Sequence, residues 1–228
     1  MVDRIVPTTT DGDRAAFAAE TGLQDQALVL TEPFSQWVIE DWFAGPRPRW
    51  EIGGAQFVAD VAPYETAKLR MLNGAHSALA YLGLEAGHVF VHQAVADPAL
   101  RPLIERLMRD EAAPTIATAP GQDLDAYAAS LMDRFGNAAL AHRLIQIAMD
   151  GSQKIPQRWL EKLAVHQQQG RQCPVIVRAI AAWLRRIRGD RRPVDDAMAP
   201  QLAHAWQEYG RDAIVGAMFG TSGLIPSA

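Results

Sequence analysis

Three polar side chains that could do chemistry lie in a largely apolar stretch of the chain between Pro63 and Gly83. Lys68 supplies an amine, Asn73 an amide and His76 an imidazole. On an α-helix, Asn73 lies about 140° round the axis from Lys68 and His76 about 80° round, so His76 falls between the other two. The three residues span about 12 Å along the axis. Together these groups could exchange a proton with a small ligand and hydrogen-bond its oxygens.

The same residues also have an ordinary structural interpretation. A helix with so many apolar residues is expected to be buried, so its polar side chains must be hydrogen-bonded or must line a cavity. A lysine near a helix start can extend to solvent, and a buried histidine can bond to a core partner. This spacing is common by chance. Only the rest of the sequence can therefore distinguish a functional site from ordinary core residues.

The elements that would position these residues are mainly helical. We expect a short helix at 11–22, strands at 27–31, 36–40 and 56–60, and a loop at 45–49. After Pro63 the pattern predicts helices at 64–83, 86–96, 99–112, 122–134, 137–149, 156–168, 174–188, 195–209 and 211–219. We therefore predict a mainly α, multi-helix domain with a small β element near the N-terminus, and treat residues 1–228 as one domain.

Composition narrows the class of protein. Hydrophobic residues make up 49% of the 228 and charged residues 21%, as in ordinary globular domains. The net charge of −4 gives no electrostatic reason to expect nucleic acid or a membrane surface as a partner. With one cysteine, no signal peptide and no long apolar run, the chain is expected to be cytoplasmic. We interpret Cys173 as a small buried residue rather than a reactive thiol.

The only basic cluster lies late in the chain. It consists of Arg185, Arg186, Arg188, Arg191 and Arg192. A Gly-Asp pair interrupts this cluster, which favours a solvated helix end stabilised by the helix dipole over an anion-binding site.

Three further segments form a specific pattern with the helix that carries Lys68. They are MVDRIVP at 1–7, EPFSQWVIE at 32–40 and QIAMDGSQKIPQR at 146–158. The set resembles the polyol-specific long-chain dehydrogenases, the mannitol 2-dehydrogenase family, and within it the fructuronate reductases, also called D-mannonate oxidoreductases. The resemblance runs from the first residue to at least Leu160, and we recognise little beyond about Gly170. It implies an all-helical carboxy-terminal domain like that of 6-phosphogluconate dehydrogenase.

The resemblance implies a reaction and roles for the three residues. The reaction is hydride transfer between NAD and a secondary alcohol or ketone of a sugar acid or polyol, without a metal. As hydride leaves carbon, the hydroxyl must lose its proton and the alkoxide-like oxygen must be stabilised. The family's catalytic lysine matches Lys68, its oxyanion-stabilising asparagine matches Asn73, and its substrate-orienting histidine matches His76.

Four other residues are candidates. The resemblance makes Glu65 a proton relay, although an exposed ion pair with Lys68 three residues later would also explain it. It makes Lys154 and Asp3 substrate-binding residues, and Asp3 lies so near the chain end that it could be frayed. Arg143 is our candidate for the carboxylate of a uronate, because a guanidinium binds carboxylates in a bidentate manner.

The family places a dinucleotide-binding domain before the VDRI segment, and the sequence contains no G-x-G-x-x-G and no P-loop. We therefore expect the carboxy-terminal half of such an enzyme, inactive by itself, with NAD bound mainly by a domain absent from this chain. The apolar face left by that domain could drive self-association. A second hypothesis is a non-enzymatic helical module for assembly or small-molecule binding that retains a vestigial site. An unrelated hydrolase is disfavoured, because G-x-S-x-G is missing. The particular sugar acid or polyol, and NAD against NADP, stay open.

Overall fold

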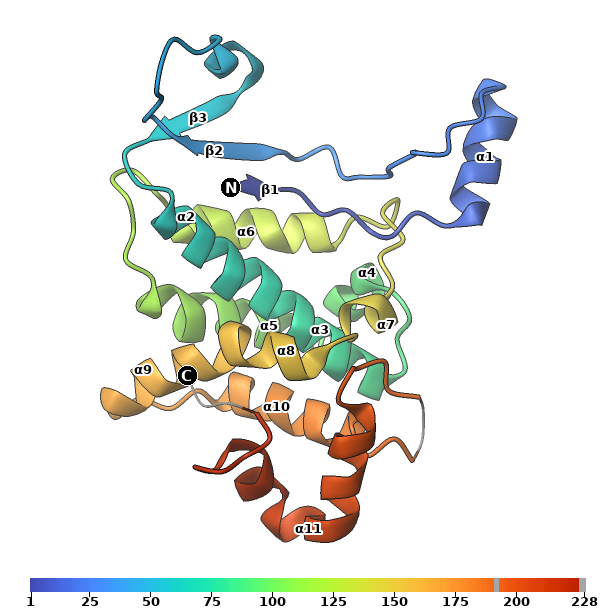
Figure 1. Cartoon of the computed structure of the whole chain (residues 1–228), viewed down its shortest axis with the longest axis vertical. Helices are drawn as coiled ribbons and strands as arrows, with labels where there is room; N and C mark the ends of the chain where they lie inside the picture. The colour runs from blue at the N-terminus through green and yellow to red at the C-terminus, as the bar shows by residue number, and fades with distance from the viewer. Residues whose placement is uncertain (191–192, 226–228) are drawn as a thin grey trace.

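The computed structural model describes residues 1–190 and 193–225. A small sheet lies at one end of the molecule and α11 at the other, with the remaining helices mostly between them (Figure 1). The strands are β1 (Val2–Asp3), β2 (Gln36–Glu40) and β3 (Ala55–Val58). The α-helices are α1 (Asp11–Thr21), α2 (Ala62–Ala67), α3 (Gly74–Ala86), α4 (Val91–Ala96), α5 (Arg101–Arg106), α6 (Leu124–Phe135), α7 (Leu144–Ile147), α8 (Gly151–Ile155), α9 (Glu161–Gln168), α10 (Pro174–Arg186) and α11 (Ala199–Phe219). The 3₁₀ turns are η1 (Trp50–Gly53) and η4 (Ala113–Thr115), and the π-turns are η2 (Lys68–Asn73), η3 (Leu107–Ala112) and η5 (Pro156–Leu160).

The sheet has the order β1-β2-β3, with β1 antiparallel and β3 parallel to β2. The strand predicted at 36–40 is confirmed as β2, and the one predicted at 56–60 is confirmed as β3, shifted slightly toward the N-terminus. The strand predicted at 27–31 is wrong, since the structure has no strand there. Val29 and Leu30 are exposed, and an apolar run without a neighbouring strand has no ladder to join. The two-residue strand β1 is too short to leave a sequence pattern.

The predicted helix at 11–22 is confirmed as α1. The side chain of Thr10 accepts from the amide of Asp13, and the carboxylate of Asp13 accepts from the amide of Thr10, which is a capping box. Gly22 ends the helix with a φ of 74°, a left-handed conformation that favours glycine.

The helix predicted at 64–83 forms the central rod of the molecule. The segments α2, η2 and α3 follow one another without a break from Ala62 to Ala86 and run diagonally through the middle of the helical layer (Figure 1). Every residue from Gly74 to Gly83 is buried. The expectation of a buried apolar helix is therefore confirmed, but its middle is a π-turn rather than α-helix.

The later helices confirm the predictions at 99–112, 122–134, 156–168 and 174–188, and the prediction that the domain is mainly α. The helix predicted at 86–96 is confirmed in its second half as α4, whereas the helix predicted at 137–149 is largely wrong, because only the short α7 forms there. The amide of Val91 donates to the carbonyl of His142, and the amide of Leu144 donates to that of Val89. Each segment thus uses its backbone groups to hold the other. The last two predicted helices form α11, which is kinked where Gly210 has a φ of 61°.

A buried ion network joins the sheet end of the molecule to α6. The guanidinium of Arg134 lies 2.7 Å from carboxylate oxygens of both Asp3 and Glu32. Tyr127 donates its hydroxyl to Asp3 at 2.5 Å, and Glu32 accepts from the backbone amide of Ile5. Because both carboxylates are almost wholly buried, their single shared cation is essential to their burial.

We expect Arg134→Met to lower the free energy of unfolding by about 3–5 kcal/mol, because it leaves two buried carboxylates without a cation. Urea denaturation measures the change. The matched control is Arg185→Met, which breaks the exposed pair between Arg185 and Glu85 and should cost less than about 1 kcal/mol. Equal effects of the two substitutions would contradict this account of the network.

Candidate active site

The three residues first singled out lie on and just after a π-turn. The turn η2 begins at Lys68 and ends at Asn73, and His76 follows in the first turn of α3. In a π-turn the hydrogen bonds run between residues five apart, so the turn is wider than an α-turn. Residues five apart therefore come to nearly the same face, as residues four apart do on an α-helix. The α-helical angle of about 140° between Lys68 and Asn73 is wrong for this segment.

We therefore expect Lys68 and Asn73 to share a face of the π-turn, and His76 follows three residues further along the chain. Lys68 is partly buried at the start of the turn, while Glu65 is exposed one turn earlier. Among the residues that the structure describes, Glu65 and Lys68 form no ion pair, so that alternative explanation of Glu65 is not supported. The role of Glu65 as a proton relay stays a prediction.

Arg158, which sequence reasoning did not assign, contacts the end of the π-turn. Its Nη1 donates to the side-chain oxygen of Ser77 at 2.8 Å and to the carbonyl of Asn73 at 3.4 Å. Burial lowers the pKa of Arg158 from its ordinary value. The sequence does hold a signal for Arg158. It follows Lys154 by four residues, and residues four apart are neighbours on a helix.

His76 is buried and carries an unused ring nitrogen. Its ring centroid lies 4.6 Å from that of Phe135 and 5.3 Å from that of His142. Burial lowers the pKa of His76 well below its usual range, and the nearby His142 and Arg158 act in the same direction. The imidazole is therefore neutral at physiological pH. Its Nε2 is buried without a hydrogen-bond partner, as are five other side-chain nitrogens of the described residues, among them the Nδ1 of His142. Such a nitrogen is available to hydrogen-bond a ligand.

The ion network of Arg134 reaches this imidazole. Arg134, His76 and His142 line one small cavity of about 10 Å³, and Arg134 in turn binds Asp3. Asp3 is fully buried in β1, so the expectation of a frayed end is wrong. Both of its carboxylate oxygens are engaged by Arg134 or Tyr127. No sequence signal pointed to Arg134, and the substrate-binding role of Asp3 stays a prediction.

Lys154 and Arg143 occupy different surroundings. Lys154 is partly buried, and its Nζ donates to the carbonyl of Met149 at 2.5 Å. Burial and then the charge of Arg158 lower the pKa of Lys154. Arg143 is exposed, and its guanidinium lies 5.8 Å from the ring centroid of Phe90. The roles of Lys154 and Arg143 stay predictions.

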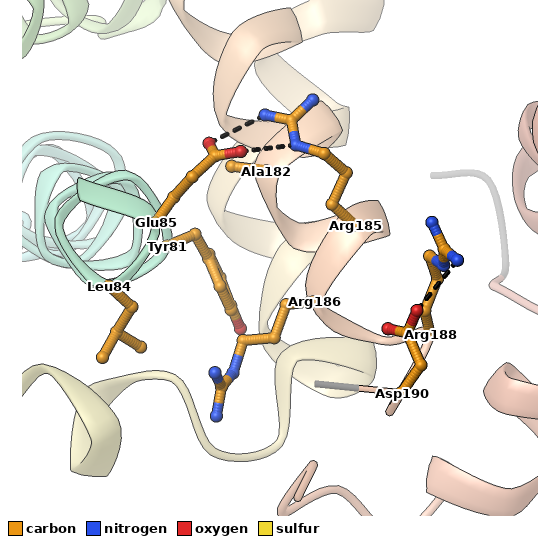
Figure 2. A pocket seen from close by; sticks show the side chains of 8 residues that line it. All are labelled: Tyr81, Leu84, Glu85, Ala182, Arg185, Arg186, Arg188 and Asp190. Carbon is orange, nitrogen blue, oxygen red and sulfur yellow. Dashed lines mark hydrogen bonds and ion pairs between the residues drawn. The ribbon is translucent and has the colours of Figure 1, made fainter. Parts of the chain in front are cut away.

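A separate cavity lies beside the basic cluster. It measures about 220 Å³ between α3 and α10 (Figure 2). Arg185 forms a bidentate pair with Glu85, and Arg188 pairs with Asp190. These pairs offset most of the positive charge, in agreement with a solvated helix end, while Arg191 and Arg192 lie outside the described residues.

The described part of the chain contains neither a candidate membrane span nor a cluster of metal ligands. None of its helices is both long and apolar enough to cross a membrane. In the same residues, no group of three or more His, Cys, Asp or Glu side chains is placed to hold a metal ion. Cys173 is buried, and burial raises the pKa of its thiol to about 11, which agrees with a structural residue.

Comparison with known proteins identifies relatives of the whole arrangement. Residues 60–219 match the mannitol dehydrogenase C-terminal domain, and residues 1–52 match the mannitol dehydrogenase Rossmann domain. D-mannonate oxidoreductase of Escherichia coli is 45% identical over 98% of the chain and 47% of its own length. A mannitol dehydrogenase of Saccharomyces cerevisiae is 40% identical over 93% of the chain and 43% of its own length.

A solved structure agrees with these sequence relationships. The mannitol 2-dehydrogenase of Pseudomonas fluorescens, in a ternary complex with NAD and D-mannitol, superposes with a TM-score of 0.85. It is 36% identical, over 97% of this chain and 47% of that one.

The chain belongs to the mannitol dehydrogenase family. Its relationship extends well past Gly170, where motifs were no longer recognisable, and the relatives with assigned names are oxidoreductases. The chain spans about half the length of the curated relatives it matches. The two family matches divide it between residues 52 and 60, near the end of the sheet, and its treatment as one domain stays a prediction.

Proposed function

We propose that this chain is the catalytic and substrate-binding half of an NAD-dependent oxidoreductase that interconverts a secondary alcohol and a ketone. The substrate class is a sugar acid or polyol of the D-mannonate/D-fructuronate type. The observation that carries the proposal is the π-turn, which begins at Lys68 and ends at Asn73, with His76 three residues further along the same rod. π-turns are uncommon in proteins but are often found at functional sites. This one coincides with the predicted catalytic residues.

Each side chain has a defined task in the proposal. The Nζ of Lys68 takes the proton of the substrate hydroxyl during oxidation and returns it during reduction. The side-chain amide of Asn73 donates to the oxygen as its negative charge develops. The free Nε2 of His76 hydrogen-bonds a neighbouring hydroxyl, and Lys154 supplies a cation over the substrate. This arrangement orients one carbon–oxygen pair against the base.

NAD supplies the hydride acceptor when it is bound. The described residues do not offer it a pyrophosphate cradle, since β2 and β3, although parallel, are joined by a loop and the 3₁₀ turn η1 rather than by a glycine-rich turn and a helix. In this proposal the residues of the chain carry out proton transfer and substrate orientation.

The test is a fusion protein in which this chain replaces the matching half of E. coli D-mannonate oxidoreductase, which is 45% identical to it. We expect NAD-linked oxidation of D-mannonate by the fusion protein and none by the 228-residue chain alone. D-mannitol, assayed in parallel, distinguishes a sugar-acid preference from a polyol preference.

A folded fusion protein that binds NADH but oxidises neither substrate would favour the non-enzymatic module instead. Turnover by the 228-residue chain alone would show that it holds a complete cofactor site. Folding is checked by cooperative urea denaturation, so that a misfolded fusion protein is not scored as an inactive one.

A further inference from the structure

The π-turn leaves one backbone carbonyl without its usual partner. In an uninterrupted α-helix the amide of Gly74 would donate to the carbonyl of Arg70, four residues earlier. Here it donates to the carbonyls of Leu69 and Met71 instead, so the carbonyl of Arg70 is passed over. A buried carbonyl in this position has to find another donor.

That donor is the side chain of Lys162 from α9. Its Nζ lies 2.9 Å from the carbonyl oxygen of Arg70, and the residue is fully buried. Gly74 makes the approach possible, because a Cβ at that position would stand 2.8 Å from the same Nζ. The ammonium thus occupies the space beside the turn that a side chain on residue 74 would fill.

Two neighbours of Lys162 donate to carbonyls further along the rod. The indole nitrogen of Trp159 donates to the carbonyl of Gly74 at 3.1 Å, and Arg158 donates to that of Asn73. Side chains on one face of η5 and α9 therefore bind three carbonyls at the junction of η2 and α3. The contact of Lys162 is the one that meets the acceptor freed by the π-turn.

We propose that Lys162 is a positioning residue that holds η2 in its π register by hydrogen-bonding the carbonyl of Arg70. The proposal rests on the proposed function of Lys68 and Asn73. Without this donor the Arg70 carbonyl is buried and unpaired, and the helix gains by returning to α-type bonds. That change rotates Lys68 away from Asn73, so Lys162 acts on the reaction without touching the substrate.

The surroundings of Lys162 leave its donor capacity intact. Burial lowers its pKa to about 7, the charge of Arg70 lowers it further, and Glu111 and Cys173 act in the opposite direction. His166 faces the same cluster and bonds the carbonyl of Glu111. A neutral amine still donates a hydrogen bond, so the contact with Arg70 persists in both protonation states of Lys162.

The first test uses the wild-type chain, which contains three lysines: Lys68, Lys154 and Lys162. With ¹⁵N-labelled lysine, the Nζ protons of Lys162 should exchange slowly with water and show nuclear Overhauser effects to the α-protons of Gly74. Rapid exchange together with no such effects would mean that the contact is absent, and this result alone would overturn the proposal.

The second test compares Lys162→Met, which cannot donate, with Lys162→Arg, which can. We expect hydrogen exchange at residues 68–76, relative to the other protected amides of the same chain, to accelerate by about tenfold in Lys162→Met, as for a lost hydrogen bond, and much less in Lys162→Arg. Lys154→Met, which removes a lysine outside the turn, is the control. A folded Lys162→Met chain with wild-type exchange at residues 68–76 would refute the proposal.

The kcat of the active fusion protein is a measurement that a purely structural role of Lys162 would not change. A displaced base lowers kcat by about 10²-fold with little change in KM, and Lys162→Arg should recover part of it. Wild-type activity of the fusion protein reports on the proposed function, whereas hydrogen exchange in the 228-residue chain reports on Lys162. The two hypotheses can therefore fail separately.

Discussion

Lys68→Ala in the active fusion protein lowers kcat by about 10²–10⁴-fold, the range that a positioned general acid or base contributes. The lysine stands at the first position of η2 and Asn73 at the last, so alanine at position 68 leaves the proposed oxygen-binding amide in place and removes only the proposed proton acceptor. Steady-state kinetics across pH measures the loss.

Added primary amines should restore part of the lost rate, because a small base can enter the space left by the side chain. The matched control is Lys154→Ala, whose lost cation should raise KM and whose defect amines should not repair. Near-normal kcat in Lys68→Ala across the pH range would remove this residue from the mechanism.

Lys162→Met changes how the stability of the chain depends on pH. Burial lowers the pKa of Lys162 to about 7, against 10.5 for a free lysine. Between these values the unfolded chain binds a proton that the folded chain does not, so wild-type stability rises with pH. At 1.36 kcal/mol per pKa unit the full rise is about 5 kcal/mol. Methionine has no such dependence, but it removes the donor to the Arg70 carbonyl, which costs about 1–3 kcal/mol.

We expect the difference in unfolding free energy between the methionine variant and the wild type to change sign with pH. At pH 6 the methionine variant should be the more stable protein by roughly 2–4 kcal/mol. Near pH 10 the unfolded lysine is still mostly protonated, so about 0.8 kcal/mol of the penalty remains and the wild type should be the more stable by roughly 0–2 kcal/mol. Urea denaturation at both pH values tests this. A difference that stays constant between pH 6 and pH 10 would mean that Lys162 does not titrate in the folded chain.

Sequence patterns predicted the elements whose residues carry a periodic or capping signal. The capping box of α1, strand β2 and the apolar rod of α3 belong to this group. Patterns failed at 27–31 and 137–149, because a strand needs a partner strand and a short helix needs free backbone groups. Both depend on distant segments, such as the one around Val89 that binds Leu144.

The candidate site was predicted in its residue types but not in its geometry. Motifs identified Lys68, Asn73 and His76, and periodicity placed them on one helix, but periodicity assumes α-helical spacing and cannot detect a π-turn. Arg134 and Lys162 lacked any local signal. Their contacts join them to Asp3, 131 residues away, and to Arg70, 92 residues away.

The π-turn η2 also gives the chain an unusual genetic vulnerability. A π-turn corresponds to an α-helix with one residue inserted. An in-frame loss of a single codon between Lys68 and Asn73 would keep every proposed site residue and nearly all of the apolar pattern. It would let the rod close into a regular α-helix in which the lysine and the asparagine stand four residues apart. The Arg70 carbonyl that Lys162 binds would then be taken by the backbone, and the buried ammonium would lose its acceptor. Variants with such a deletion would pass most sequence comparisons as intact members of the family.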